Sequence, residues 1–399
     1  MGLTGLLATA LCVAAIGCSG VGDAASSGSP TAPGGPPPPA PPASTTVTEP
    51  PPTAPTLIHV HYPTKGRRLT LRGDGAGLSW DRGAAVTSIG TDSFEYRVVT
   101  PGDAPLAFKP LLDDVWSRGP NYTVRPHQTT DIYPRFVEAR GSVEVPYPAF
   151  TSKALPSTRK IRVYLPPTYR ENPLVRMPVL YMHDGQNLFS PVTAFGGNEW
   201  RIDEAMDQGA EDGSIREAIV VGIDNTPERV AELTPTMVPG YGGGKADAYL
   251  EMIEKELAPL VERDLRVLPG RENRGIAGSS LGGLLSSYAG VRRGSVFGLV
   301  GSFSPSTWWD GRVILEEVAS LPGRPAKPIR VYVDSGDAGP SADDVVNTKE
   351  LAASYRSAGY KDGVDLLYLV QPGARLPARA RALIARRLDG GVAPRRHRR

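Results

Sequence analysis

Residues 275–283 read Gly-Ile-Ala-Gly-Ser-Ser-Leu-Gly-Gly and contain the pattern Gly-x-Ser-x-Gly-Gly, with Ser280 at its centre. A short segment of strand character precedes this serine and a helical segment, 284–291, follows it, so the context is that of a nucleophile elbow. We expect glycine at Gly278 and Gly282 because a Cβ there would collide with neighbouring backbone. The pattern predicts a serine hydroxyl exposed at the carboxyl edge of a parallel sheet, beside helix N-terminal amides that would hold an oxyanion. The alternative is a Gly/Ser-rich loop without chemistry, which the strand–helix context disfavours.

From about residue 141 onward, apolar runs of strand length alternate with helical stretches. One stretch, 245–263, is amphipathic, with Tyr249, Ile253 and Leu257 on one face. This alternation favours an α/β fold with a mostly parallel sheet covered by helices on both faces, and active sites then lie at the carboxyl ends of the strands. The expected strands are 161–165, 179–182, 218–223, 275–278, 299–303, 329–333 and 366–370.

Three segments together resemble one family. They are Pro-Val-Leu-Tyr-Met-His-Asp-Gly-Gln-Asn-Leu-Phe at 178–189, the Ser280 elbow, and Ser-Pro-Ser-Thr-Trp-Trp at 304–309. They resemble the esterase D-type α/β-hydrolases, a group that includes enterochelin esterases, feruloyl and acetyl-xylan esterases, and mycolyltransferases. The likeness runs from about residue 143 to 368. It implies a serine esterase that acts on acyl esters, including carbohydrate-linked ones, by hydrolysis or acyl transfer and without a metal or other cofactor.

The resemblance and the elbow together assign roles to several residues. Ser280 would attack the ester carbonyl, and the backbone N–H of Leu281 would hold the oxyanion. The family match places a second donor at Gln186, and each such donor contributes roughly 3 kcal/mol in the transition state. Trp308 and Trp309 would line the substrate pocket, with core packing as the alternative.

The acid of the triad should follow the strand at 329–333. Counting from the strand end favours Asp337, whereas counting back from the next helix favours Asp343, and the sequence does not separate them. Asp334 and Asp344 are further candidates. The alternative for Asp343 and Asp344 is that they are charges at a helix N-terminus.

The base is missing from its expected place. The family has a histidine after the last strand, within a run resembling Gly-Ala-x-His, whereas this chain has Arg375 in Pro-Gly-Ala-Arg-Leu-Pro-Ala-Arg at 372–379. Without a base a serine hydroxyl is a poor nucleophile. Three interpretations follow: a shifted reading frame near codon 375, a relative that binds without hydrolysing, or substitution by His183 or His397. We expect His183 and Asp184 to shape the oxyanion loop rather than to do chemistry.

Residues 56–137 read as short strands separated by Gly, Asp and Pro, which predicts a β-sandwich. The module contains Leu-Ser-Trp at 78–80, Phe-Lys at 108–109 and Trp-Ser-Arg-Gly-Pro-Asn at 116–121. These motifs loosely resemble those of the starch-binding carbohydrate modules, which implies a glucan site built from Trp80, Lys109, Trp116 and Asn121. The alternative is that both tryptophans pack in the sandwich core. His59 and His61 could form a metal pair, but no third ligand is near them in sequence, so a plain strand face is the expectation and no metal site is predicted.

The first 18 residues are apolar and end in Cys18, in a pattern similar to a bacterial lipoprotein signal, although no Lys or Arg precedes the apolar run. We therefore expect export, either to the bacterial cell envelope as an outer-membrane lipoprotein or to the extracellular space. Lipidation is expected at Cys18, with an ordinary signal peptide or a weak anchor as alternatives. A Pro-rich linker, 19–55, would follow. An α/β-hydrolase domain at 138–390 and an Arg-rich tail at 391–399 complete the expected organisation.

Charge and cysteine content exclude two further classes of function, nucleic-acid binding and cysteine chemistry. The net charge is +2, but residues 372–399 alone carry +8, which leaves −6 for the remainder. The mildly acidic body offers no basic face for nucleic acid. Both cysteines, Cys12 and Cys18, precede the folded part, so disulfides and cysteine nucleophiles are not expected there.

Overall fold

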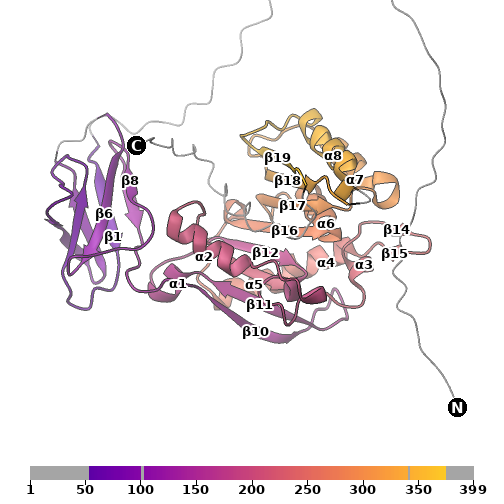
Figure 1. Cartoon of the computed structure of the whole chain (residues 1–399), viewed down its shortest axis with the longest axis horizontal. Coiled ribbons are helices and arrows are strands. Elements are labelled where there is room, and N and C mark those ends of the chain that lie inside the picture. The colour runs from indigo at the N-terminus through magenta and orange to yellow at the C-terminus, as the bar shows by residue number, and fades with distance from the viewer. Residues whose placement is uncertain (1–53, 100–102, 340–341, 374–399) are drawn as a thin grey trace, which may run out of the picture. The chain divides into compact units, whose positions relative to one another are not determined.

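The computed structural model describes residues 54–99, 103–339 and 342–373 (Figure 1). The expected signal, nearly all of the expected linker, and the Arg-rich tail lie outside the described residues. So do Cys18, Arg375 and His397. None of the described helices combines the length and hydropathy needed to cross a membrane.

The α/β part is built on an eight-stranded sheet in the order β10-β11-β13-β12-β16-β17-β18-β19. Six neighbouring strands of this order, β13, β12, β16, β17, β18 and β19, run parallel to one another. At the β10 edge, β11 pairs antiparallel with both β13 and β10. The predicted mostly parallel sheet is therefore confirmed. Its strands are β10 (Ser142–Phe150), β11 (Arg159–Leu165), β12 (Val179–His183), β13 (Ile219–Ile223), β16 (Arg274–Ser280), β17 (Leu299–Pro305), β18 (Arg330–Gly336) and β19 (Leu366–Gln371).

All seven expected strands are present, and the sequence prediction missed only the edge strand β10 of this sheet. Most of the β10 side chains are exposed, and prolines separate its apolar residues, so the sequence lacks the uninterrupted apolar run of the central strands. The two prolines are Pro146 and Pro148, which cannot donate to a neighbouring strand and are tolerated at a sheet edge. A strand of this composition is compatible only with an outer position.

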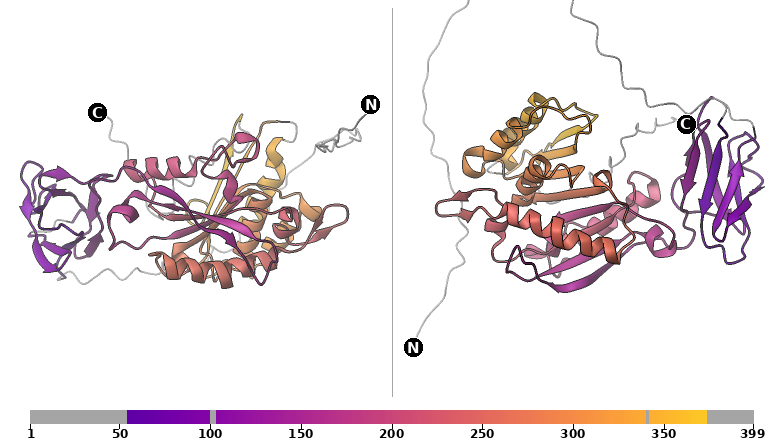
Figure 2. Two further views of the ribbon diagram at one scale, coloured as in Figure 1. Left: turned by 90° about the horizontal axis from the view of Figure 1, so that it is seen from below. Right: turned by 180° about the vertical axis from the view of Figure 1, so that it is seen from behind.

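Helices cover both faces of the sheet (Figure 2). The expected amphipathic stretch forms α4 (Ala246–Met252), a π-helical turn (Ile253–Leu257) and α5 (Ala258–Asp264) in one continuous run. Proline at the start of α5 removes one amide donor from the ladder, where the turn widens. The other helices are α1 (Pro167–Glu171), α2 (Ile202–Asp212), α3 (Arg229–Glu232), α6 (Leu281–Arg292), α7 (Trp309–Ala319) and α8 (Val345–Ser357).

Alternating side chains of the central strands belong to two separate cores. On β12, Tyr181 belongs to the larger core, to which α4, α5, α6, α7 and α8 also contribute, whereas Leu180 and Met182 belong to a smaller core that includes Ile202 and Met206 of α2. This is the period-two alternation of a strand buried on both faces. The buried sheet thus provides a rigid support for residues at its carboxyl edge.

The N-terminal part forms two sheets around one core. One sheet has the order β4-β5-β1-β9, and the other has the order β3-β2-β6-β7 with β8 paired to β6. Residues of both sheets, among them Val60 and Phe108, are fully buried in a shared cluster. The strands are β1 (Leu57–His61), β2 (Leu69–Gly73), β3 (Ala84–Ala85), β4 (Thr87–Gly90), β5 (Ser93–Arg97), β6 (Leu106–Leu112), β7 (Val115–Trp116), β8 (Tyr122–Val124) and β9 (Thr129–Ile132).

Candidate active site

Ser280 is the last residue of β16, and α6 begins at Leu281. Its backbone has φ 58° and ψ −120°, a strained conformation for a residue with a side chain. Ser280 is exposed, whereas its neighbours Ser279 and Leu281 are buried. The turn therefore presents one hydroxyl to solvent at the carboxyl edge of the parallel sheet, directly before a helix N-terminus.

The glycines of the elbow are required by close packing. A Cβ built on Gly278 would lie 2.7 Å from Cδ2 of His183 and 2.9 Å from the backbone carbon of Gly282. A Cβ on Gly283 would lie 2.9 Å from the carbonyl oxygen of Phe303. The expectation for Gly282 was wrong in one respect: its Cβ would meet the side chain of His183 at 3.2 Å rather than backbone. The histidine side chain lies against both glycines because β12 and β16 are neighbours.

Ser280 is joined to the segment that follows β17. Its Oγ lies 3.1 Å from Oγ of Ser306, and the Ser306 N–H donates to the Ser280 carbonyl oxygen at 2.9 Å. No other hydrogen bond of the Ser280 side chain occurs among the described residues. Sequence reasoning gave Ser306 no role, although it lies within the 304–309 motif. The contact fixes the position of this motif beside the nucleophile.

The candidate oxyanion donors lie on two neighbouring strands. The Leu281 N–H opens α6, where amides have no partner within the helix. Gln186 lies in a 3₁₀ turn, Gly185–Asn187, directly after β12, and its Oε1 accepts from the Asn225 N–H at 3.0 Å. Because β12 pairs in parallel with β16, the turn that carries Gln186 is at the same sheet edge as Ser280. Sequence reasoning missed the contribution of Asn225.

Asp184 anchors this oxyanion loop. Its buried carboxylate accepts two hydrogen bonds from Arg229, at 2.7 and 2.8 Å, and one from Asn225 Nδ2 at 2.8 Å. Burial alone would raise the pKa of Asp184, but the hydrogen bonds and charge of Arg229, together with the Asn225 hydrogen bond, lower it, so the carboxylate stays charged. Arg229 comes from α3, more than 40 residues away along the chain, which is why the sequence did not reveal the pair.

His183 is buried beneath the elbow. Its side chain is fully enclosed, Nδ1 lies 3.2 Å from the Tyr249 hydroxyl, and no bond joins it to Ser280. Burial lowers the pKa of His183 to about 4. A neutral imidazole packed under the glycines holds the turn in place and is not in position to accept the Ser280 proton.

The two candidate acids lie at the same sheet edge but have different partners. Asp337, exposed just after β18, accepts from the Gly373 N–H at 2.6 Å. Asp343 accepts from the Gly336 N–H at 2.7 Å and from Ser304 Oγ at 2.5 Å. Asp337 thus contacts the segment after β19, where the family resemblance expects the base, whereas Asp343 joins the ends of β17 and β18.

The neighbouring carboxylates have other surroundings. Asp334 is buried within β18 and accepts from Tyr332 at 2.8 Å and from the Ser304 N–H at 3.1 Å, and burial raises its pKa to about 6. Asp344 directly precedes α8 and accepts from Asn347 at 2.6 Å, in keeping with a helix N-terminal charge.

The two tryptophans after Ser306 differ. Trp308 is 47% exposed, whereas Trp309 is 1% exposed, belongs to the larger core and donates through Nε1 to Thr236. The expectation that Trp309 lines a substrate pocket is therefore corrected: its ring packs in the core. Trp308 keeps an exposed ring two residues from Ser306.

The four expected glucan-binding residues are partly brought together in the sandwich. Trp80 and Trp116 lie with ring centroids 6.2 Å apart and planes tilted by 43°. Neither belongs to the sandwich core, and Trp116 is 40% exposed, so the alternative of two core tryptophans is wrong. The Lys109 ammonium donates to the Gly119 carbonyl at 2.6 Å, and Asn121 is exposed in the loop after it.

Comparison with known proteins adds the family. The model of the "Putative esterase" family matches residues 152–364. The "Uncharacterized protein YbbA" of Bacillus subtilis is 30% identical over 186 residues, which cover 45% of this chain and 68% of that protein. The siderophore triacetylfusarinine C esterase of Aspergillus fumigatus is 33% identical over 153 residues, which cover 36% of this chain and 49% of that protein. The siderophore hydrolase EstB of Aspergillus nidulans has a similar structure, with a TM-score of 0.50 and 23% identity, covering 61% of this chain and 92% of that one.

The family match spans more than half of the chain, so the protein belongs to this esterase family. Its mixed sheet with helices on both faces is the expected α/β-hydrolase fold. The family and its relatives identify a carboxylic-ester hydrolase. The chain spans about half the length of the A. fumigatus relative, and the family match begins at residue 152, beyond the sandwich. The likeness of the sandwich to starch-binding modules therefore stays a prediction.

Proposed function

We propose that this protein hydrolyses acyl esters of small molecules through an acyl-enzyme on Ser280. One observation carries the proposal: an exposed serine is held at φ 58° between β16 and the N-terminus of α6. A side chain in this conformation is strained, and such strain is typical of functional positions. The glycines packed on His183 are what permit the turn.

In the proposed reaction, Ser280 Oγ attacks the ester carbonyl carbon and the carbonyl oxygen becomes an oxyanion. The Leu281 and Gln186 N–H groups would stabilise that charge, and its collapse would release the alcohol and leave the acyl group on Ser280. Water then hydrolyses the acyl-enzyme and releases the carboxylic acid. A base must take the Ser280 proton and give it to the departing alcohol, and then take a proton from the attacking water and return it to Ser280. The family resemblance places this base after β19, beyond the last described residue of this region.

For the substrate we propose siderophore-type esters first, because the A. fumigatus relative is a siderophore triacetylfusarinine C esterase. Carbohydrate-linked acyl esters are the second class, supported by the neighbouring rings of Trp80 and Trp116, of which Trp116 is exposed and Trp80 partly buried. Triacetylfusarinine C and an acetylated xylan, each incubated with the full chain and followed by chromatography, separate the two. Cleavage of neither, with turnover of a simple p-nitrophenyl ester, would reject both substrate classes and leave the esterase proposal standing.

The test of the nucleophile is the hydrolysis of p-nitrophenyl acetate by the full chain and by Ser280→Ala. Ser354→Ala is the matched control, because that hydroxyl lies on the exposed side of α8 and donates within its own helix. We expect Ser280→Ala to abolish turnover and the control to keep it. Equal rates for all three proteins would reject the proposal.

A second candidate is a catalytically impaired carbohydrate-binding protein on the hydrolase scaffold. It is favoured by Arg375, which stands where the family has its histidine. A fluorophosphonate probe distinguishes the two: labelling of Ser280 with turnover supports the esterase, whereas neither labelling nor turnover supports the binding protein. Retention on immobilised glucan, lost in Trp116→Ala and kept in Val115→Ala, would support binding by the sandwich; both valine and tryptophan are exposed on β7.

We further propose that the protein is exported to the bacterial cell envelope and anchored by lipid on Cys18. The support is the apolar segment that ends at this cysteine and the Pro-rich stretch that follows. The chain supplies its own control, because Cys12 is the only other cysteine. Incorporation of an alkynyl fatty acid in a bacterial host should be lost in Cys18→Ala and kept in Cys12→Ala. Equal labelling of both variants would contradict lipidation at Cys18.

A further inference from the structure

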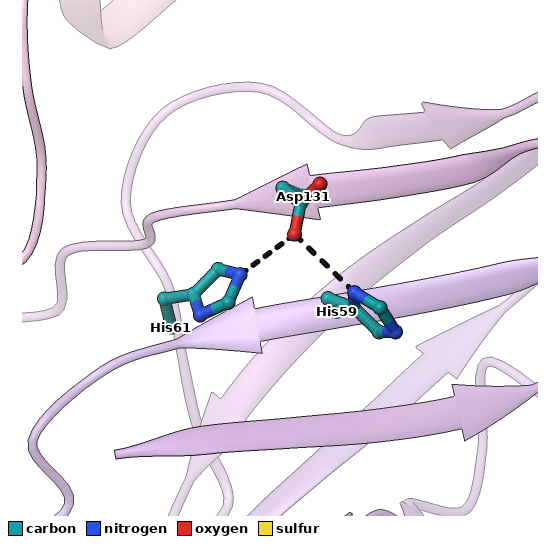
Figure 3. A group of neighbouring side chains, drawn as sticks. All are labelled: His59, His61 and Asp131. Atoms are coloured by element: carbon teal, nitrogen blue, oxygen red, sulfur yellow. Dashed lines mark hydrogen bonds and ion pairs between the residues drawn. The ribbon is translucent and has the colours of Figure 1, made fainter. Parts of the chain in front are cut away.

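Two histidines and a carboxylate meet on the outer face of a sandwich sheet. His59 and His61 point to the same face of β1, and β9 runs parallel to β1 with Asp131 directly beside His59. Asp131 Oδ1 lies 3.3 Å from His59 Nδ1 and 2.7 Å from His61 Nε2 (Figure 3). No third candidate ligand lies near the two histidines in sequence, and Asp131, 70 residues after His61, fills that place in the structure.

The spacing of these atoms suits a small divalent ion. One donor atom from each of the three residues lies within 4.8 Å of the others. Zinc binds imidazole nitrogen and carboxylate oxygen at about 2.0–2.2 Å in tetrahedral geometry, which separates its ligand atoms by roughly 3.3 Å. The distance from His59 Nδ1 to Asp131 Oδ1 already has this value. A small rotation of the half-exposed Asp131 carboxylate would lengthen its distance to His61 Nε2, which is now 2.7 Å.

The second nitrogen of each ring has its own partner. His61 Nδ1 lies 2.9 Å from Ser93 Oγ, and His59 Nε2 lies 3.2 Å from Glu95 Oε2. Both partners come from β5, on the other side of β1. Histidines that ligate metals almost always bond through the other ring nitrogen to an oxygen that fixes the ring. An ordinary strand face does not require two such outer contacts on adjacent histidines.

The cluster is also open to solvent. The side chains of His59 and His61 are about a fifth exposed, and that of Asp131 is half exposed. An ion at this position would keep access to solvent.

We propose that His59, His61 and Asp131 bind one divalent ion of the zinc class, with water in the fourth position. Imidazole together with carboxylate selects a borderline transition metal over calcium or magnesium, which prefer oxygen ligands throughout. Ser93 and Glu95 would orient the two imidazoles. The ion would join β1 to β9 and, through these outer contacts, to β5.

The proposal is tested by titrating ZnCl₂ into the full chain, prepared without a polyhistidine tag and stripped with a chelator. Isothermal titration calorimetry should give one ion per chain. His61→Ala and Asp131→Asn should each weaken binding at least a hundredfold, and Ser93→Ala by about tenfold to a hundredfold. His127→Asn is the matched control, because this histidine of the same sandwich already bonds the Ala54 carbonyl at 2.9 Å and should leave the affinity unchanged.

Two further measurements keep the test independent of folding and of esterase activity. Cobalt(II) bound by the wild-type chain should show the visible absorption of a tetrahedral site, and Asp131→Asn should lose it. Ser280→Ala should bind zinc like the wild type, because the two sites use different residues. Absence of binding, or equal binding by the His61→Ala and Asp131→Asn variants and the wild type, would show that the cluster is only a hydrogen-bond network or that zinc binds elsewhere, and either result overturns the proposal.

Discussion

The imidazole of His183 lies directly against Gly278, so that a Cβ at position 278 would approach its Cδ2 to 2.7 Å. The histidine ends β12 and the glycine belongs to the neighbouring strand β16. Tyr249 of α4 bonds the far side of the ring. The nucleophile turn is thus supported from below by a histidine that is itself fixed by a helix.

This contact predicts that Gly278→Ala destabilises the protein. The added methyl would meet both the His183 ring and the Gly282 backbone, and overpacking of this kind costs about 2 kcal/mol. Because any relief must shift the turn, kcat should fall together with the melting temperature. Thermal unfolding and p-nitrophenyl ester hydrolysis measure the two effects.

Gly90→Ala is the control for a glycine that has room, since a Cβ there makes only an ordinary 3.6 Å contact with Ser93. Gly90→Ala should change neither the melting temperature nor the rate of ester hydrolysis. Gly278→Ala with wild-type stability and turnover would contradict the packing described for the elbow.

His183 should make the unfolding free energy depend on pH. Burial lowers its folded-state pKa from 6.5 to about 4, so between these values the unfolded chain binds the proton more readily. The contribution of neutral His183 is complete above pH 6.5 and is lost as pH falls toward 4, by about 1.4 kcal/mol per unit. Wild type and His183→Gln, unfolded in urea at several pH values, should therefore converge as pH falls.

Tyr249→Phe separates the causes of this slope. It removes the hydroxyl at 3.2 Å from Nδ1 but keeps the ring that encloses the histidine. The slope should persist in this variant because burial is the larger cause of the shift. A slope that vanishes with the hydroxyl would assign the shift to the hydrogen bond instead.

The sequence predicted the scaffold well because its signals are local. Each parallel strand is buried on both faces and therefore forms a short apolar run, and the elbow needs its glycines within one turn of chain. The strand β10 gave no such signal, because Pro146 and Pro148 separate its apolar residues. The alternation on β1 showed that His59 and His61 share a face, but not that β9 would bring Asp131 to them.

The site was only partly predictable because its contacts join distant segments. Ser306 follows a different strand from Ser280, and Arg229 reaches Asp184 from a separate helix. Partners of this kind depend on strand order, which no local pattern contains. A local pattern can also mislead. The position of Trp309 in the 304–309 motif suggested a substrate pocket, whereas its ring is buried in the larger core.

The ion pair of Asp184 and Arg229 predicts a strong effect of Arg229→Ala. Removal of the guanidinium leaves a buried carboxylate without its cation, which costs about 3 kcal/mol. The ion pair lowers the pKa of Asp184 in the wild type, and its loss should raise that pKa, so the deficit should be larger at pH 7 than at pH 4. Urea unfolding at both pH values measures it.

Asp184→Asn in the Arg229→Ala background should recover part of the lost stability at pH 7, because no buried charge then remains. Arg201→Ala is the control for an exposed pair, with Glu204, and should have no measurable effect. Equal losses at the two pH values, or a double variant no more stable than Arg229→Ala, would show that the uncompensated charge of Asp184 is not the cause.

Substitution of each candidate acid should show which one acts in catalysis, because one variant should lose stability and the other should lose turnover. Asp343 accepts from the Gly336 amide and the Ser304 hydroxyl, so Asp343→Asn should lower the melting temperature and reduce turnover only in proportion to unfolding. Asp337 is exposed and bonds only the Gly373 amide among the described residues, so Asp337→Asn should leave the melting temperature close to that of the wild type. If Asp337 orients the base after β19, as its contact there indicates, this variant should lower kcat at least tenfold while KM is unchanged. The opposite result would assign the acid to Asp343: a stable Asp337→Asn variant that keeps full kcat, and a stable Asp343→Asn variant that loses it.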